Sequence, residues 1–157
     1  MTRLRGRAPR GQRLLAKCPH GHWRTTTMIS SIRLDGSTAC LTIEAATDTD
    51  VFRAYVREIL CPKLHPGDVV IMDNLSPHKN DQTLALICAA GASGEFLPAY
   101  SPDFNPIELM WSKVKAILRA AEARTAPDLL AAIGQALRRV TAQDAAHWFA
   151  HCGYSFK

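Results

Sequence analysis

The sequence predicts a single α/β domain in which a mixed β-sheet is flanked by helices. The chain has 157 residues, of which 47% are hydrophobic and 21% charged, so it is long enough for one sizeable core. Strand-like and helix-like runs alternate in the order hairpin, helix, strand, helix, strand, helix, which is typical of a sheet covered by helices. A short, fully apolar strand at 69–72 leads into an acid, at the position where open α/β sheets place their ligands.

The first half of the chain predicts a β-hairpin followed by a helix. Residues 23–34 and 37–46 are rich in threonine, serine and aliphatic residues, and Asp35-Gly36 between them suits a tight turn. Thr47 and Asp50 have the spacing of a capping box, and Pro62 is expected to end the helix that they begin. The apolar face of this helix comprises Val51, Phe52, Tyr55, Val56, Ile59 and Leu60.

The second half predicts two strands and further helices. Residues 66–68 turn the chain into the 69–72 strand, after which a helix near 82–90 and a short strand around 95–97 are expected. Asn105 is a suitable cap for the next helix, with Pro106 at its first position. Residues 123–157 are expected to form C-terminal helices. The apolar stripe of the helix after Asn105 comprises Ile107, Met110, Trp111, Val114, Ile117, Leu118 and Ala121.

Positive charge is concentrated at the N-terminal end of the chain. Residues 1–34 contain eight lysines and arginines and no acid, while the net charge of the whole chain is +5. The segment 1–22 is therefore predicted to be a flexible basic arm that binds nucleic-acid phosphates independently of sequence. A solvated tail that aids solubility is the alternative. The predicted nucleic-acid contacts are Arg3, Arg5, Arg7, Arg10 and Arg13 in the arm, and Lys113, Lys115 and Arg119 on the polar face of the helix after Asn105.

The composition argues against membrane-spanning and secreted proteins. No apolar stretch approaches the ~18–20 residues of a membrane span, and no apolar region follows the basic N-terminus as in a secretory signal. We therefore expect a cytoplasmic protein. Cys18 with His20 and His22 has the spacing of no common zinc module. Reduced core thiols are expected for all five cysteines, Cys18, Cys40, Cys61, Cys88 and Cys152.

Asp73 and Glu108 are the candidate catalytic residues. Asp73 follows the 69–72 strand, and Glu108, after thirty-four intervening residues, lies in the first turn of the helix that Asn105 begins. Each acid has a structural alternative, since Asp73 can satisfy a turn and Glu108 can complete a capping box. Because a strand end and a first helical turn can converge on one point, the two carboxylates can share a divalent cation. Mg²⁺ is the natural ion for such an all-oxygen site.

The residues around these two acids form a pattern that covers nearly the whole chain. It comprises Asp73-Asn74, His78, the run Leu-Pro-Ala-Tyr-Ser-Pro-Asp-Phe-Asn-Pro-Ile-Glu at 97–108, Trp111, Lys115, and Pro-His-Gly-His-Trp at 19–23 with three threonines at 25–27. This pattern resembles the DDE transposases, in the bacterial insertion-sequence branch of the mariner-like superfamily. The resemblance implies a ribonuclease-H-like fold and metal-dependent cleavage and joining of DNA at transposon ends.

The resemblance also implies roles for individual residues. Asp73 would be the second catalytic acid of the family and Glu108 the third. Both would hold Mg²⁺ or Mn²⁺ in the family's two-ion site. Four further residues match the family motif without an assigned role, and each is alternatively a plain loop or cap residue: Asn74, His78, Tyr100 and Asn105.

The chain departs from the family at its N-terminal end. The family's first acid lies on an opening strand, the centre of the related sheet, upstream of the segment that residues 1–13 resemble. We therefore expect the first acid and the central strand to be missing. Unpaired edges should remain on the hairpin and on the 69–72 strand, with residues 12–17 partly filling the space. Asp35, Asp48 and Asp50 suit turns and helix starts, which leaves Glu44 as the least implausible replacement acid.

Three functions remain open from the sequence. The first is an N-terminally truncated transposase catalytic domain at 1–157 that is inactive alone and forms homo-oligomers or associates with a full-length transposase. The second is a non-enzymatic DNA-binding or interaction remnant that modulates a full-length transposase. The third is an unrelated metal-dependent nuclease of the same fold, which needs a replacement acid near Asp73 and Glu108.

Overall fold

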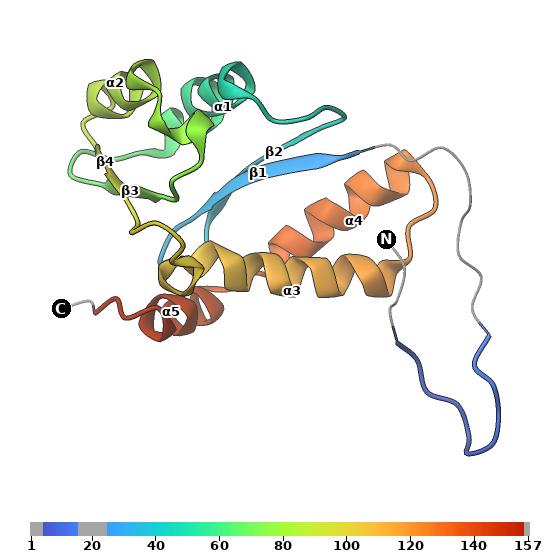
Figure 1. The fold of residues 1–157 in the computed structure, drawn as a ribbon. Coiled ribbons are helices and arrows are strands. Elements are labelled where there is room, and N and C mark those ends of the chain that lie inside the picture. Colours follow the sequence, from blue (N-terminus) through green and yellow to red (C-terminus); the bar gives the residue numbers. More distant parts are fainter. Residues whose placement is uncertain (1–4, 16–24, 156–157) are drawn as a thin grey trace.

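The α/β architecture is confirmed by the computed structural model, which describes residues 5–15 and 25–155 (Figure 1). Helices flank two short β-structures, and no described helix is long and apolar enough to cross a membrane. In order along the chain, the elements are β1 (Thr27–Ile32), β2 (Thr38–Ile43), α1 (Thr49–Tyr55), β3 (Val69–Met72), α2 (Asp81–Ala89), β4 (Ser93–Phe96), α3 (Pro106–Ala121), α4 (Ala126–Arg138) and α5 (Ala142–His151).

The strands form two separate two-stranded sheets instead of the one mixed sheet that the sequence predicts. β1 pairs with β2 in antiparallel register, and β3 pairs with β4 in parallel register. Among the described strands, β1 and β3 therefore have one hydrogen-bonded neighbour each. This confirms the expectation of unpaired edges on the hairpin and on the 69–72 strand.

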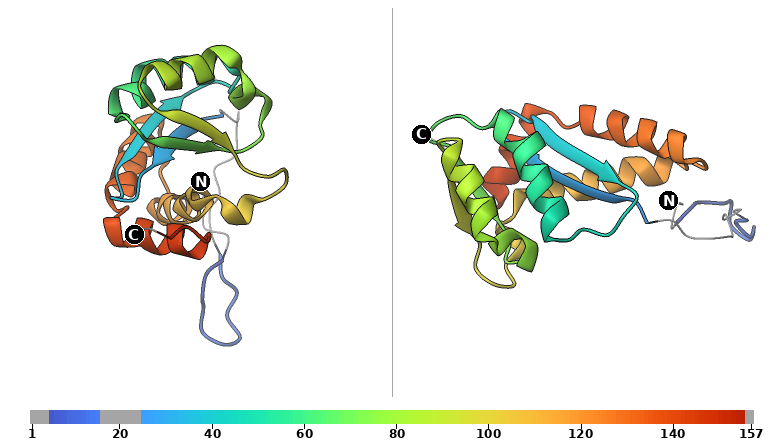
Figure 2. Two further views of the ribbon diagram at one scale, coloured as in Figure 1. Left: turned by 90° about the vertical axis from the view of Figure 1, so that its left-hand side faces the viewer. Right: turned by 90° about the horizontal axis from the view of Figure 1, so that it is seen from above.

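Two hydrophobic clusters lie on opposite faces of the hairpin. Helices α1 and α2 lie over one face, and α3, α4 and α5 lie on the other side (Figures 1 and 2). Because side chains alternate along β1, Ile29 packs against the first cluster while Met28 and Ile32 pack against the second. The first cluster comprises Phe52, Tyr55, Val56, Leu60, Met72, Ile87 and Ala92, and the second comprises Met110, Val114, Leu118, Ala132, Ile133, Ala136 and Val140.

The hairpin turn has the predicted position. Gly36 has a φ of +81°, and the Asp35 carboxylate accepts a hydrogen bond of 2.8 Å from the Ser37 amide. Hydrogen bonding by the side chain and then the backbone of Ser37 holds the pKa of Asp35 below its ordinary value. The hydrogen-bonded pair next to the turn is Arg33 with Ser37, because the Arg33 amide donates to the Ser37 carbonyl at 3.0 Å.

The start and the end of α1 differ from the prediction. The N-cap is Asp48, whose carboxylate accepts a hydrogen bond of 2.8 Å from the Val51 amide, so the predicted Thr47–Asp50 capping box is wrong. Asp48 lies one residue after the predicted cap, Thr47, and its carboxylate accepts a hydrogen bond from a free amide of the first helical turn. The helix then continues through a π-helical turn at Val56–Leu60 into a 3-10 turn at Cys61–Lys63, so Pro62 lies inside its last turn.

The cysteines are only partly as predicted. All four described cysteines are free, and Cys152 is buried as expected of a core thiol. Cys88 is exposed on the outer side of α2, so the core assignment is wrong for it. Cys18, His20 and His22 lie outside the described residues.

Candidate active site

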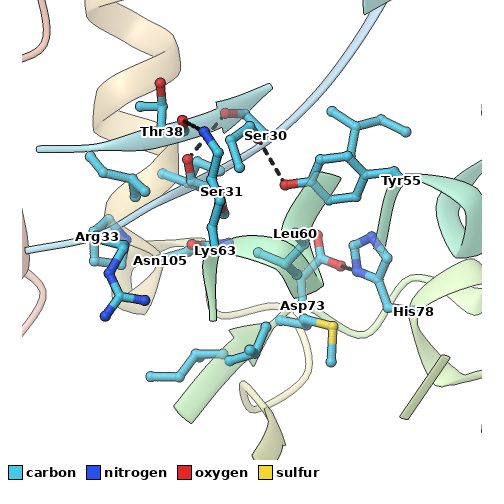
Figure 3. A pocket seen from close by; sticks show the side chains of 18 of the residues that line it. Ser30, Ser31, Arg33, Thr38, Tyr55, Leu60, Lys63, Asp73, His78 and Asn105 are labelled. Carbon is cyan, nitrogen blue, oxygen red and sulfur yellow. Dashed lines mark hydrogen bonds and ion pairs between the residues drawn. The ribbon is translucent and has the colours of Figure 1, made fainter. Parts of the chain in front are cut away.

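A cavity of about 590 Å³ lies between β1 and β3, where the two sheets approach each other (Figure 3). We call it the inter-sheet cavity. Its walls come from both β-structures and from both helical layers. Asp73 and Glu108 both line it, so the structure brings the two predicted catalytic acids to one cavity. Its lining also includes Met28, Ser30 and Ile32 of β1, Val69 and Ile71 of β3, Phe52 and Tyr55 of α1, Leu60, and Ile107 and Trp111 of α3.

The side chain of Asp73 is held by two neighbours at the end of β3. Its Oδ1 atom accepts a hydrogen bond of 3.1 Å from the Leu75 amide. The same oxygen lies 2.7 Å from Nδ1 of His78, a contact that is an ion pair when the ring of His78 is protonated. The ring of His78 lies against that of Phe52, with ring centroids 4.2 Å apart. Asp73 is thus oriented by the loop that follows it and by the core behind that loop.

Asn74 acquires a structural role. Its side-chain Nδ2 donates a hydrogen bond to the Leu97 carbonyl, while the Leu97 amide donates to the Met72 carbonyl at 2.9 Å. Asn74 therefore ties the end of β3 to the end of β4. The effect is to fix the backbone from which the Asp73 carboxylate projects.

Glu108 lies exposed in the first turn of α3. Asn105 occupies the N-cap position as predicted, but its side chain makes no capping hydrogen bond and also lines the inter-sheet cavity. The Glu108 carboxylate makes no hydrogen bond or ion pair with the described residues, so the capping-box alternative does not form. Among the described residues, the Glu108 carboxylate therefore has no structural partner that would compete with a bound cation.

The donor atoms suit a hard divalent cation in type. Mg²⁺ is usually bound through one or two carboxylates and keeps several waters, so Asp73 and Glu108 match its usual protein ligands in type and number. In residues 5–15 and 25–155, however, no cluster of three or more histidine, cysteine or acidic side chains is close enough to ligate a metal. None of the replacement acids considered from the sequence lines the cavity: Asp35 and Asp48 accept turn and cap hydrogen bonds, Asp50 pairs with Arg53, and Glu44 lines a separate small pocket.

Asp68, which no sequence motif marks as a site residue, is a third acid that lines the cavity. Arg33, after β1, donates two hydrogen bonds to Asp68, before β3, at 2.5 and 2.9 Å. This bidentate pair bridges the two sheets at the end of the cavity opposite Asp73. The Arg33 guanidinium lowers the pKa of Asp68 to about 2, and Asp68 raises the pKa of Arg33.

The Arg33–Asp68 pair predicts an acid-sensitive contribution to stability. The pKa of Asp68 falls from 3.8 to about 2 on folding, so the contribution is complete above pH about 4 and is lost as the pH falls towards 2. We expect Asp68→Asn to cost about 1 kcal/mol of unfolding free energy at pH 6, since both side chains keep some contact with water. The cost should vanish near pH 2. Urea unfolding from pH 6 to 2 measures it, and Asp81→Asn, at an exposed acid of α2, is the control. A pH-independent cost would contradict the assignment.

Two further cavity residues had no predicted role. The buried Tyr55 hydroxyl donates to the Ala39 carbonyl at 2.9 Å, and its burial raises the pKa of the phenol well above the ordinary value. Lys63 donates to the Thr38 carbonyl at 3.1 Å. Both contacts fasten the α1 layer to β2. They depend on tertiary packing, so no local sequence signal identifies them.

The predicted nucleic-acid contacts are in different surroundings. The described part of the arm, 5–15, stands away from the body, and its four arginines are exposed (Figure 1). It forms no strand and lines no part of the cavity, so the expectation that residues 12–17 fill the space is wrong for 12–15. Arg3 lies outside the described residues. On α3, Lys115 is exposed and Arg119 is half-buried, whereas Lys113 pairs with Asp144 of α5 at 2.5 Å.

Tyr100 is fully exposed in the loop before α3. Its φ of +56° places it in the left-handed region, which is uncommon for a residue with a side chain. It does not line the inter-sheet cavity. Of the four motif residues without a predicted role, Asn74, His78 and Asn105 gain contacts or a cavity position, and Tyr100 does not.

A model of a known protein family matches most of the chain. The family is described as DDE superfamily endonuclease, and the match covers residues 1–130. The matched range contains both sheets, Asp73, Glu108 and the start of α4. No curated protein matches the chain.

Proposed function

The chain belongs to the DDE superfamily endonucleases, and on this premise we propose that it is a transposase catalytic-domain fragment of the bacterial insertion-sequence branch of the mariner-like superfamily. The family reaction is cleavage of DNA strands and, in transposases, their transfer. The observation that supports the proposal is that Asp73 at a strand end and Glu108 in a first helical turn line one cavity. Each acid matches a carboxylate of the family motif. The proposed substrate, DNA, implies that the protein acts in the cytoplasm.

Asp73 and Glu108 would hold Mg²⁺ or Mn²⁺. Such ions activate the attacking oxygen and stabilise the leaving oxygen in phosphodiester chemistry. His78 and the Leu75 amide hold the Asp73 carboxylate, and Asn74 holds the strand end beneath it. These contacts would keep Asp73 in place when a phosphate approaches. The exposed arginines of the arm would contact the DNA backbone.

The described residues supply two of the three acids that the family uses. We propose that the chain alone has no useful transposition activity. Losing even a partner of a metal ligand often costs ~10 to 100-fold, and losing a ligand should cost at least as much. Association with a full-length transposase, or between copies of this chain, would be a route to a complete site.

Cation binding tests the proposed site without requiring activity. We expect Mn²⁺ to broaden the amide NMR signals around Asp73 and Glu108 selectively. Asp73→Asn and Glu108→Gln should each weaken the apparent Mn²⁺ affinity by at least ~tenfold, because each removes a charged ligand. Asp81→Asn is the matched control and should change nothing. Equal Mn²⁺ affinity in all four proteins would refute the site. Strand-transfer product that Asp73→Ala abolishes would refute the inactivity of the isolated chain.

The second candidate, a non-enzymatic DNA-binding remnant, is favoured by the exposed arginines of the arm. We expect DNA affinity to fall steeply with salt. Replacing Arg5, Arg7, Arg10 and Arg13 with alanine should reduce the slope of log affinity against log salt by about 0.9 for each phosphate that is no longer neutralised. The Lys115→Ala, Arg119→Ala double variant tests α3 separately. Salt-dependent binding without Mn²⁺ binding would favour the remnant, and an unchanged slope would exclude the arm.

A further inference from the structure

The two carboxylates of the candidate site differ in how they are held. The Asp73 carboxylate accepts a hydrogen bond from the Leu75 amide and lies against His78. The Glu108 carboxylate has no such partner among the described residues, and the Asn105 side chain caps no amide of the turn that carries it. A helix end without a side-chain cap frays, because its first amides lack partners within the helix. The position of Glu108 therefore depends on contacts that fix the backbone at the start of α3.

A contact from outside α3 reaches that backbone. The hydroxyl of Tyr154, three residues beyond the end of α5, donates a hydrogen bond of 2.9 Å to the Phe104 carbonyl. Phe104 ends the 3-10 turn at Pro102–Phe104, which passes directly into the N-cap of α3. Tyr154 and Glu108 both line the inter-sheet cavity, so this hydrogen bond lies beside the candidate active site.

The way in which α5 ends fixes the direction of the Tyr154 side chain. Gly153 has a φ of +87°, the left-handed conformation in which many helices terminate. Its amide donates to the Ala150 carbonyl, and the Tyr154 amide donates to the Phe149 carbonyl, each at 3.0 Å. These two bonds form a Schellman motif, and the Tyr154 ring packs edge-on against Phe149 with centroids 5.6 Å apart. The cap uses the backbone and the ring of Tyr154, which leaves the hydroxyl for Phe104.

Helix α5 is also fastened to α3 at its other end. Lys113 of α3 pairs with Asp144 in the first turn of α5 at 2.5 Å, and Asp144 completes a capping box with Thr141. Lys113 lies nine residues after Phe104, and Tyr154 lies ten residues after Asp144. α5 therefore runs antiparallel beside the first half of α3, as Figures 1 and 2 show, and contacts it at both ends.

Two backbone hydrogen bonds connect Phe104 to Glu108. The Asn105 amide donates to the Pro102 carbonyl at 2.9 Å, and the Glu108 amide donates to the Asn105 carbonyl at 3.1 Å. A shift of the Phe104 carbonyl would displace the 3-10 turn and both of these bonds. The orientation of the Glu108 side chain thus follows the carbonyl that Tyr154 holds.

We propose that Tyr154 is a positioning residue for Glu108, whose hydroxyl holds the start of α3 where Glu108 can share a cation with Asp73. The inference rests on the proposed function, because the cation site requires both carboxylates at once. The family match covers residues 1–130, so it includes neither α5 nor Tyr154. A tyrosine that only stabilised the end of α5 would have no energetic coupling to Glu108.

Hydrogen exchange without metal tests the positioning directly. Tyr154→Phe removes the hydroxyl and keeps the ring that packs on Phe149, so the variant should fold. We expect exchange at the amides of Asn105 and Glu108 to become about fivefold faster, the factor that corresponds to one intramolecular hydrogen bond. Tyr100→Phe, at a fully exposed tyrosine outside the cavity, should leave both rates unchanged. Unchanged rates in Tyr154→Phe would overturn the proposal.

A double-mutant cycle with Glu108 separates positioning from stability. Tyr154→Phe should weaken the apparent Mn²⁺ affinity about threefold, because Glu108 would be in the binding position for a smaller fraction of the time. The same substitution should have no further effect in the Glu108→Gln protein, and its effect should persist in the Asp73→Asn protein. An equal loss with and without Glu108 would refute the positioning role.

Tyr55→Phe is the matched control for the cycle. The Tyr55 hydroxyl also donates to a backbone carbonyl at 2.9 Å, that of Ala39, but this bond joins α1 to β2. The effects of Tyr55→Phe and Glu108→Gln on Mn²⁺ affinity should therefore add. Coupling as large as that of Tyr154 would show that the cycle reports general stability, and would overturn the proposal. Tyr154→Ala, which also removes the ring, is the second variant and should act in the same direction as Tyr154→Phe but more strongly.

The two measurements distinguish this inference from the proposed function. Faster exchange at Asn105 and Glu108 in Tyr154→Phe, with no Mn²⁺ bound near Asp73 in the wild type, would support the contact and refute the cation site. Equal Mn²⁺ affinity in the wild type and Tyr154→Phe, with unchanged exchange, would leave the cation site in place and refute the role of Tyr154.

Discussion

Truncation of Phe52 to alanine is expected to lower the unfolding free energy by ~3–5 kcal/mol, as for other buried phenylalanines. Phe52 is 4% exposed, belongs to the cluster beneath α1 and contacts the rings of both Tyr55 and His78. The cost combines the loss of buried apolar surface with the cavity that remains. Urea unfolding at neutral pH measures it.

Phe52→Leu separates the stability of the core from the orientation of the site. Leucine keeps apolar volume, so it should cost much less stability, but it removes the ring against which His78 lies. We expect this variant to fold and to bind Mn²⁺ more weakly than the wild type, because His78 no longer positions Asp73. Wild-type Mn²⁺ affinity in a folded Phe52→Leu variant would show that the ring contact has no part in orienting Asp73.

Gly36→Ala is expected to destabilise the protein by about 2–5 kcal/mol, from left-handed backbone strain and overpacking together. Gly36 has a φ of +81°, and a Cβ atom there would lie 2.6 Å from the Thr141 carbonyl carbon and 2.7 Å from the Ala142 nitrogen. These are backbone atoms at the start of α5, so the hairpin turn and the helix would have to separate. Thermal and urea unfolding measure the loss.

Gly67→Ala is the matched control for that prediction. Gly67 has a φ of +89°, but a Cβ atom there meets nothing within 4 Å. Its cost should be confined to the strain of the left-handed conformation, ~1–2 kcal/mol. Equal costs at Gly36 and Gly67 would mean that the collision with α5 is relieved without loss of packing.

Local signals in the sequence predicted the individual elements well. The apolar run 69–72 coincides with β3 because a turn at Pro66-Gly67-Asp68 delimits it on one side and a polar loop on the other. The strand expected around 95–97 is instead Ser93–Phe96, because Ser93 and Gly94 are weak strand formers that only pairing with β3 makes extended. The cap of α1 was misplaced because threonine and aspartate are both suitable N-caps.

Long-range relationships could not be predicted from the sequence. The division into two sheets depends on which edges meet, and residue patterns along the chain carry no information about that. The Arg33–Asp68 bridge joins residues that are 35 positions apart, of which Arg33 belongs to the predicted first hairpin strand and Asp68 to a predicted turn. Likewise, Lys113 looks like part of an exposed basic face until α5 places Asp144 beside it. That Asp73 and Glu108 border one cavity was expected because a strand end and a first helical turn can converge, and because both acids match the motif of the family that the sequence resembles.

The presence of a hydrophobic cluster on each side of the hairpin has a consequence for unfolding. In the described chain, β1 contributes partly buried side chains to both clusters, whereas α1 with α2 and α3 with α4 each serve one. Regions that share few contacts open as separate cooperative units. The half that carries β3 and Asp73 can therefore open while the half built on α3 stays folded, with the hairpin as the boundary between the two cooperative units.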